Sequence, residues 1–395
     1  MHGARSTLSG NRLFTLGFRP FYLLAAAFAV LAVVLWLFSS GGLLRYGSYL
    51  QGTFLHSHEM VFGFAVAVIA GFLLTAVRNW TGLPTPTGPT LASMAAVWLA
   101  GRVLIVTGPP VLAVVVDVLF VPLLAVVVAR PILKSRNRRN FKIIALLMLI
   151  ALCNVFYHLA ALGPMPAWLA YTTIIVALDL ITLLYAVVAG RVIPAFTRNA
   201  VPESNPKSAA WIEIAAFGSL ILMIVTKISS DWFSVPTLLP NGLVIVATVA
   251  HTFRLAFWQP YKTVGNPLLW MLPVAYSWLP VALFLRVLAQ YSTVAQSTWI
   301  HALMIGAISS MMLAMMMRSS LGHTGRALRA SGMDMAAFLL LQLAAILRVI
   351  VDLLPADSYR LTIVASGTLW VLAFGIFLLR YVPMLVKPRI DGRPG

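Results

Sequence analysis

The stretch HSHEMVFGFAVAVIAGFLL, residues 56–74, decides the fold class of this chain. It is almost continuously apolar and about as long as the roughly 20 residues that a helix needs to cross a bilayer. Strands of a membrane barrel would instead alternate polar and apolar residues over about 10 positions. The whole chain is 61% hydrophobic and only 10% charged, whereas about a quarter of a soluble chain is charged. The sequence therefore predicts an all-α polytopic membrane protein.

Apolar runs of this kind recur along the chain and predict twelve transmembrane helices. The links between them are short and rich in turn residues, which leaves no room for a soluble domain. We expect an N-terminal tail over residues 1–19, a transmembrane domain over 20–381 and a C-terminal tail over 382–395. The expected spans are 20–38, 57–77, 90–106, 110–129, 142–163, 168–189, 209–227, 238–257, 267–288, 298–317, 335–354 and 361–381.

Most basic residues fall on one side of the membrane if twelve spans alternate. The positive-inside rule then places both termini in the cytoplasm. The net charge of +18 does not indicate nucleic-acid binding, because the charges lie in separate short loops and not on one basic face. The residues on this side are Arg5, Arg12, Arg19, Arg130, Lys134, Arg136, Arg138, Arg139, Lys142, Arg191, Arg198, Lys207, Arg318, Arg326, Arg329, Lys387, Arg389 and Arg393.

Four histidines, His56, His58, His158 and His301, are predicted at the same depth near the outer face. Imidazole is costly to bury in hydrocarbon unless it is paired. Neutral imidazole is also a common ligand of metals and of haem iron. A single histidine would more simply be a polar residue at a helix end, or one bonded to a neighbouring helix. Four at one depth favour a metal or haem role for at least two of them.

Two histidines on different helices at one depth are what a bis-histidine haem requires. We predict that His301 pairs with His58 or His56, and we prefer His58 because it lies deeper. The two cannot both face one ligand, since positions two apart in a helix diverge by about 200°. His158 and the remaining histidine are then left for copper or for a position beside the haem. The single cysteine, Cys153, excludes a C-x-x-C-H covalent haem site, so any haem would be held non-covalently.

Several acids also lie within predicted spans, and their partners cannot be read from sequence. Glu59 would orient His58 or relay protons, and Arg102 would pair with an acid or a haem propionate. Asp179 would close an ion pair or belong to a proton route. The intramembrane acids are Glu59, Asp117, Asp179, Glu213 and Asp352.

A weak internal repeat appears at a spacing of four spans. The second, sixth and tenth spans are each followed by a basic turn, namely RNWTG at 78–82, RVIPAFTRNA at 191–200 and RSSLGHTGR at 318–326. This pattern indicates three four-helix units.

Four segments together resemble the NnrS family, bacterial inner-membrane proteins that respond to nitric oxide. They are FRPFYLLAAAFAVLAVVLW at 18–36, the run from 56 to 82, LDLITLLYAVVAGRVIPAFTRNA at 178–200 and the run from 301 to 326. The resemblance implies a multi-pass protein that contains haem and copper and acts in denitrification and nitrosative-stress defence. It further implies a redox metalloprotein acting on nitric oxide or nitrosylated products, with an electron donor that the sequence does not identify.

The family's polar pattern maps onto His56, His58, Glu59, His158, His251, His301 and His323. On this basis His251 and His323 join His56 and His158 as candidate metal ligands. Many members carry a histidine early in the ninth span, where this chain has Pro273, and copper occupancy is in question for that reason.

The architecture is also similar, more loosely, to subunit I of haem–copper oxidases. Those proteins arrange twelve spans in three four-helix arcs and hold a low-spin haem between their second and tenth helices. This chain lacks a histidine in its sixth span, so the analogy supports the haem pair and not a binuclear oxygen site. A fold analogy does not establish function.

Two other functions remain open from sequence. Twelve spans with buried acids also suit a metal-free transporter or permease. A sensor that passes on haem occupancy without turnover would have the same ligands.

Overall fold

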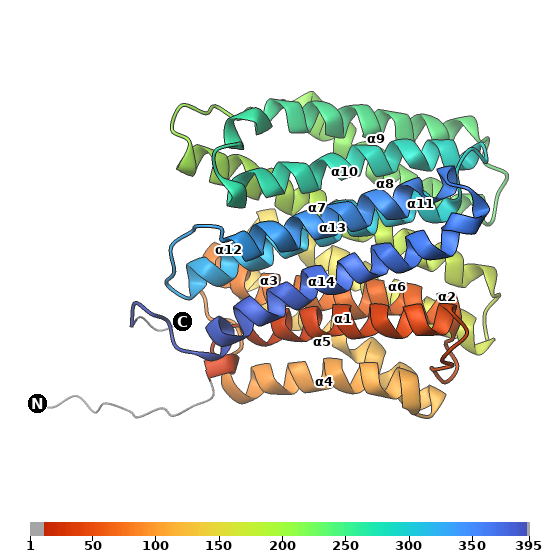
Figure 1. The fold of residues 1–395 in the computed structure, drawn as a ribbon, viewed down its shortest axis with the longest axis horizontal. Helices are drawn as coiled ribbons and strands as arrows, with labels where there is room; N and C mark the ends of the chain where they lie inside the picture. Colours follow the sequence, from red (N-terminus) through yellow and green to blue (C-terminus); the bar gives the residue numbers. More distant parts are fainter. Residues whose placement is uncertain (1–11, 393–395) are drawn as a thin grey trace, which may run out of the picture.

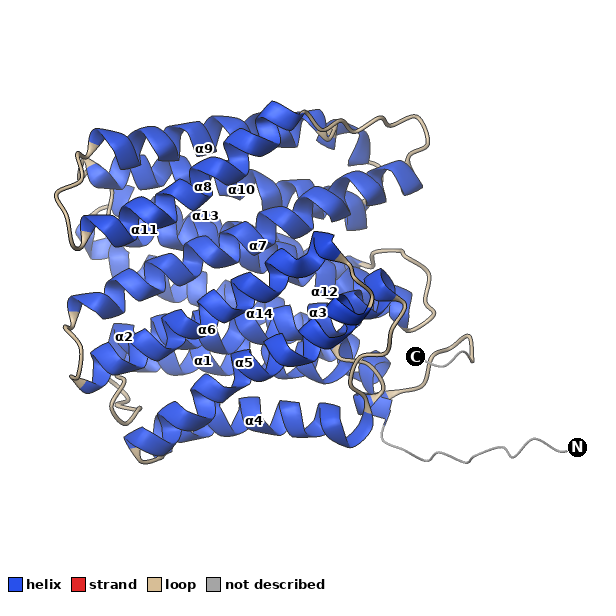
Figure 2. Ribbon diagram, turned by 180° about the vertical axis from the view of Figure 1, so that it is seen from behind, coloured by secondary structure: helices blue, strands red, loops and turns tan. Residues whose placement is uncertain are grey.

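Long apolar helices make up the structure, a computed structural model that describes residues 12–392. Within that range the chain forms helices and connecting loops with no strand (Figure 2). Twelve of the helices are long and apolar enough to cross a membrane. The prediction of an all-α polytopic membrane protein with twelve spans is therefore confirmed.

Ten of the spans are single helices, and two are interrupted. The single helices are α1 (Phe18–Ser40), α4 (Gly88–Thr107), α5 (Pro110–Lys134), α6 (Phe141–Leu162), α7 (Trp168–Ala200), α8 (Ala210–Ser230), α9 (Leu238–Phe257), α10 (Pro267–Gln290), α13 (Gly332–Ile350) and α14 (Tyr359–Val386). The second span consists of α2 (Gly52–His58), a π-helical segment (Glu59–Ala65) and α3 (Val66–Thr81). The tenth consists of α11 (Gln296–His301), a π-helical segment (Ala302–Ser309) and α12 (Ser310–His323).

The second, sixth and tenth spans form the centre of the bundle. Buried residues make up 94%, 89% and 78% of their most apolar windows, which are the highest shares among the twelve. The other spans surround them, and α1 packs against α3 of the central second span and against α14 of the surrounding spans. These three central spans are four spans apart, which is the spacing at which the basic turns recur in the sequence.

Local sequence explains where several helices begin and end. Gly82 and Gly163 adopt left-handed backbone conformations, with φ of +70° and +99°, directly after α3 and α6. Glycine is favoured at such a position because it has no Cβ to clash. At the start of α13, Ser331 and Asp334 bond to each other's backbone N–H groups in a capping box.

The two ends of the bundle are formed by different parts of the chain. The described chain enters and leaves on the same side, and α2 and α11 lie at the opposite end (Figure 1). The first span begins at Phe18 and the last continues to Val386, a few residues beyond the predicted domain boundaries. Residues 1–11 and 393–395 lie outside the described part of the chain, and so do the predicted basic positions Arg5 and Arg393.

Both π-helical segments begin directly after a histidine of the outer layer. Glu59–Ala65 follows His58, and Ala302–Ser309 follows His301. A π-helical turn holds one more residue than an α-helical turn and is frequent at functional sites. The two interruptions therefore lie in central spans, beside the residues with candidate chemistry.

Candidate functional site

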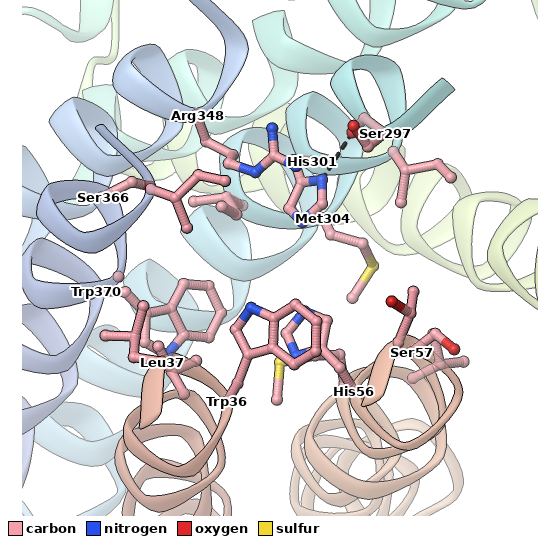
Figure 3. Close-up of a pocket in the computed structure, with 18 of the residues that line it drawn as sticks. Trp36, Leu37, His56, Ser57, Ser297, His301, Met304, Arg348, Ser366 and Trp370 are labelled. Atoms are coloured by element: carbon pink, nitrogen blue, oxygen red, sulfur yellow. Dashed lines mark hydrogen bonds between the residues drawn. The ribbon is translucent and has the colours of Figure 1, made fainter. Parts of the chain in front are cut away.

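His56 and His301 face each other across a cavity between α2 and α11 (Figure 3). Their ring centroids are 6.5 Å apart and the ring planes differ by 16°. The cavity has a volume of about 200 Å³. Most of its wall is apolar, including Trp36, Met304 and Trp370. The two imidazoles are thus the main polar groups that converge from opposite sides.

Each of these rings is held by a neighbour. The indole of Trp36 stacks on His56, with ring centroids 4.4 Å apart. The Nδ1 of His301 lies 2.7 Å from the carbonyl oxygen of Ser297, one helical turn earlier. Because a carbonyl only accepts, Nδ1 carries the proton, and the lone pair of Nε2 remains for a ligand.

Arg348, near the end of α13, also lines this cavity. Its side chain is buried, and its Nη1 atom has no hydrogen-bond partner among the described residues. A buried guanidinium without a partner is costly. An anionic group bound in the cavity would supply that partner.

His58 points away from this cavity and into a second cluster. Its Nδ1 is 2.8 Å from Glu59 Oε1, and its Nε2 is 3.0 Å from Asn154 Oδ1. The expected divergence of His56 and His58 is therefore confirmed. The preferred pairing of His58 with His301 is wrong, because the same divergence directs His56, and not His58, toward α11.

The second cluster brings His58 together with Asp117 and His158. One potential ligand atom from each of these buried residues lies within 4.8 Å of the others. His158 Nε2 is 2.8 Å from Asp117 Oδ2, and His58 Nε2 is 3.2 Å from the same oxygen. Among residues 12–392, this is the one group of three such side chains arranged closely enough to hold a metal ion.

The hydrogen bonds of His58 require more protons than a neutral imidazole has. Both ring nitrogens face oxygen acceptors, yet a neutral imidazole carries only one N–H. Asn154 cannot be turned to relieve this, because its Nδ2 already donates to Asp117 Oδ2 at 2.8 Å. The arrangement therefore needs either an additional proton or a metal cation beside Nε2.

A count of charges leads to the same requirement. Arg102 contacts the carboxylates of both Glu59 and Asp117. Two carboxylates and one guanidinium leave one negative charge in excess, in a place where nearly all side-chain surface is buried. One further positive charge, from a proton or a monovalent cation, would make the cluster neutral.

Tyr49 closes the cluster from the loop before α2. Its hydroxyl is 2.8 Å from His158 Nδ1. Burial and the nearby Glu59 carboxylate raise the pKa of the Tyr49 phenol. Tyr49 therefore stays protonated at neutral pH and is a hydrogen-bonding partner that fixes the His158 ring.

The remaining predicted residues lie elsewhere. His251 Nδ1 is 2.7 Å from the Tyr276 hydroxyl, and the ring is fully buried. His323 ends α12 on the side of the termini, where its ring packs against Phe18. The structure does not bring either histidine into the two clusters.

Two ionic residues that the sequence singled out are paired in the structure. Asp179 makes a two-pronged ion pair with Arg286, at 2.6 and 3.1 Å. Arg102 pairs with acids and does not line the His56–His301 cavity. Pro273 lies within α10 and belongs to neither cluster.

Sequence reasoning missed Asn154 and Arg348. Asn154 is four residues before His158 on α6, so both lie on one helix face, and that spacing could have identified it. Arg348 is the one basic residue within the eleventh span. Because a charge is costly in a membrane, its presence there could have identified it as a candidate site residue. Asp117 was visible as an intramembrane acid, although its partners were not.

These features define a multi-pass membrane protein with two histidine clusters near one end of the bundle, one half-buried around His56 and His301 and one buried around His58 and His158. A family model described as NnrS protein matches residues 12–389. The chain belongs to the NnrS family, as its motifs indicated, and this membership fits a role in the response to nitric oxide. No curated protein matches the chain.

Proposed function

We propose that this protein is a haem b protein of the nitric oxide response and that His56 and His301 hold the haem. The opposed pair of rings carries the proposal. Two imidazoles on opposite sides of one iron have centroids about 6 Å apart, because metal–nitrogen bonds are near 2.0 Å. The separation of 6.5 Å between His56 and His301 is close to this value.

Other features of the cavity support a porphyrin. Its walls are largely apolar, and Arg348 offers an unpaired guanidinium that suits a carboxylate such as a haem propionate. A porphyrin needs more space than about 200 Å³, so Met60 and Met304 would have to move. Both are flexible side chains of the kind that adapts to a guest.

Haem held by both imidazoles would supply a redox-active iron, and nitric oxide would bind to that iron only after one imidazole is released. The chain's own residues have other tasks. Trp36 and the Ser297 carbonyl orient the two imidazoles, and the apolar walls exclude water.

We further propose that the second cluster holds copper. Imidazole suits copper, and His58 and His158 offer two such rings beside Asp117. The single missing positive charge equals the charge of Cu(I). Glu59, Arg102 and Asn154 would orient these ligands through the hydrogen bonds described above. His251 and His323 have no role in this proposal.

The proposed location is the bacterial inner membrane, with both termini in the cytoplasm. The described part of the chain enters and leaves on one side of the bundle (Figure 1). Because the basic loops lie on that side, the positive-inside rule supports this orientation. The two histidine clusters then lie toward the periplasm.

The test is the absorption spectrum of protein purified after haem-replete expression. We expect a Soret band in the wild type, loss of that band in His301→Ala, and retention in His323→Ala as the control. A wild-type protein without a Soret band would overturn the haem proposal and favour a metal-free transporter. An unchanged spectrum in His301→Ala would exclude His301 as a ligand.

A further inference from the structure

A basic cavity lies at the opposite end of the bundle from the histidine clusters. It is formed by the start of α6, the end of α7, the loop before α8, the start of α8 and the end of α9, and its volume is about 300 Å³. Since a water molecule in the liquid occupies about 30 Å³, such a space holds a small anion together with several waters. Nothing in the proposed haem or copper chemistry uses it.

Positive charge greatly exceeds negative charge around this cavity. One carboxylate, that of Glu213, faces six cationic side chains. Only Arg254 forms an ion pair with it, at 2.8 and 3.0 Å, and the other five have no carboxylate partner among the described residues. The six cations are Arg139, Lys142, Arg191, Arg198, Lys207 and Arg254.

Two of the guanidinium groups are fixed in position. Arg254 is buried and donates to the Ala186 carbonyl at 2.8 Å and to the Tyr276 hydroxyl at 2.9 Å. A Cβ on Gly190 would collide with its Nη2 atom, so any larger residue at position 190 would force this guanidinium to shift. Arg191 donates to Asn140 Oδ1 at 2.6 Å.

The remaining cations and a helix end complete the cavity. Lys142, Arg198 and Lys207 are exposed, so their long side chains can move to contact a ligand, and among them Lys142 already lies over the ring of Phe217, which also lines the cavity. Helix α8 begins at Ala210, just after Lys207, and no side chain caps its first turn. Its free backbone N–H groups add to the attraction for an anion.

We propose that this cavity binds a phosphate-bearing anion. Phosphate carries more than one charge and several acceptor oxygens, which suit an array of fixed guanidiniums and mobile ammonium groups. Two sources share this chemistry, an anionic phospholipid headgroup at the membrane surface and a free phosphate in solution. The site is separate from the histidine clusters and does not depend on what they hold.

The test compares charge removal inside and outside the cavity in the full-length protein. The cavity variant is Lys142→Gln, Arg198→Gln and Lys207→Gln together. The control is Lys134→Gln, Arg136→Gln and Arg329→Gln, which removes the same charge from exposed positions that do not line the cavity. One arm titrates inorganic phosphate into phosphatidylcholine nanodiscs by calorimetry. The other measures retention of phosphatidylglycerol by native mass spectrometry.

We expect the cavity variant to bind one of the two probes at least about tenfold more weakly and the control to match the wild type. A loss limited to phosphatidylglycerol identifies a lipid headgroup, and a loss of phosphate binding identifies a soluble anion. Equal binding by the wild type and the cavity variant in both arms would overturn the proposal. An equal loss in the control would also overturn it, because surface charge alone would then explain binding. If the triple variant cannot be purified, Arg198→Gln alone, at an exposed site, is compared with Arg329→Gln.

Discussion

His56 and His58 are two residues apart in α2, yet their imidazole rings belong to different clusters. His56 stacks on Trp36 and faces His301, whereas His58 contacts Glu59, Asn154 and Asp117. One short helix therefore supplies a side chain to each of the two candidate centres. This separation makes the two proposed cofactors independently testable.

Replacing these two histidines should give opposite results. His56→Ala removes one imidazole from the opposed pair, so we expect the low-spin haem spectrum to be lost while bound copper is retained. His58→Ala should retain haem and lose copper. Optical spectra and elemental analysis of the same preparations measure both. Loss of haem in His58→Ala alone would contradict the assignment.

Arg348→Leu should weaken haem binding without affecting its ligands. The variant removes the unpaired guanidinium from the cavity wall. A charge-assisted hydrogen bond contributes about 1.5–3 kcal/mol, so we expect haem transfer to apomyoglobin to accelerate at least about tenfold. Arg360→Gln, an exposed arginine at the start of α14, is the control. An unchanged transfer rate in Arg348→Leu would show that Arg348 does not contact the haem.

Arg102→Gln should strongly destabilise the fold. It leaves the buried carboxylates of Glu59 and Asp117 without their shared cation, and breaking a buried pair costs about 3–5 kcal/mol. The measurement is the free energy of unfolding in mixed micelles. Lys227→Gln, in the partly exposed pair with Asp231, should cost about 1 kcal/mol or less. Equal effects of the two variants would be inconsistent with a special role for the buried cluster.

Gly190→Ala should disturb the basic cavity. The added methyl group would collide with the Arg254 guanidinium, and overpacking of this kind costs about 1–3 kcal/mol. The free energy of unfolding should fall by that amount. Gly218→Ala, where a Cβ meets nothing within 4 Å, should leave stability unchanged or slightly higher. A destabilised Gly218→Ala protein would point instead to a general intolerance of alanine in these helices.

The spans could be predicted because hydropathy is a local property of the sequence. The histidine layer was also predictable, since the depth of a residue follows from the order and direction of the spans. The partners were not, because Asp117, Asn154 and Arg348 reach the two clusters from three different helices. Their contacts depend on how those helices rotate and pack, which a single sequence does not reveal. Haem and copper themselves remain predictions.

The π-helical segments after His58 and His301 determine the direction in which the side chains of α2 and α11 point. A segment that holds one extra residue rotates everything beyond it by about 100° relative to an uninterrupted α-helix. Deleting one residue from Glu59–Ala65 would therefore restore regular winding and swing His56 and His58 around the helix axis, while α3 kept its buried contacts. The orientation of the outer end of such a span can therefore change without any change in the packing of its inner end.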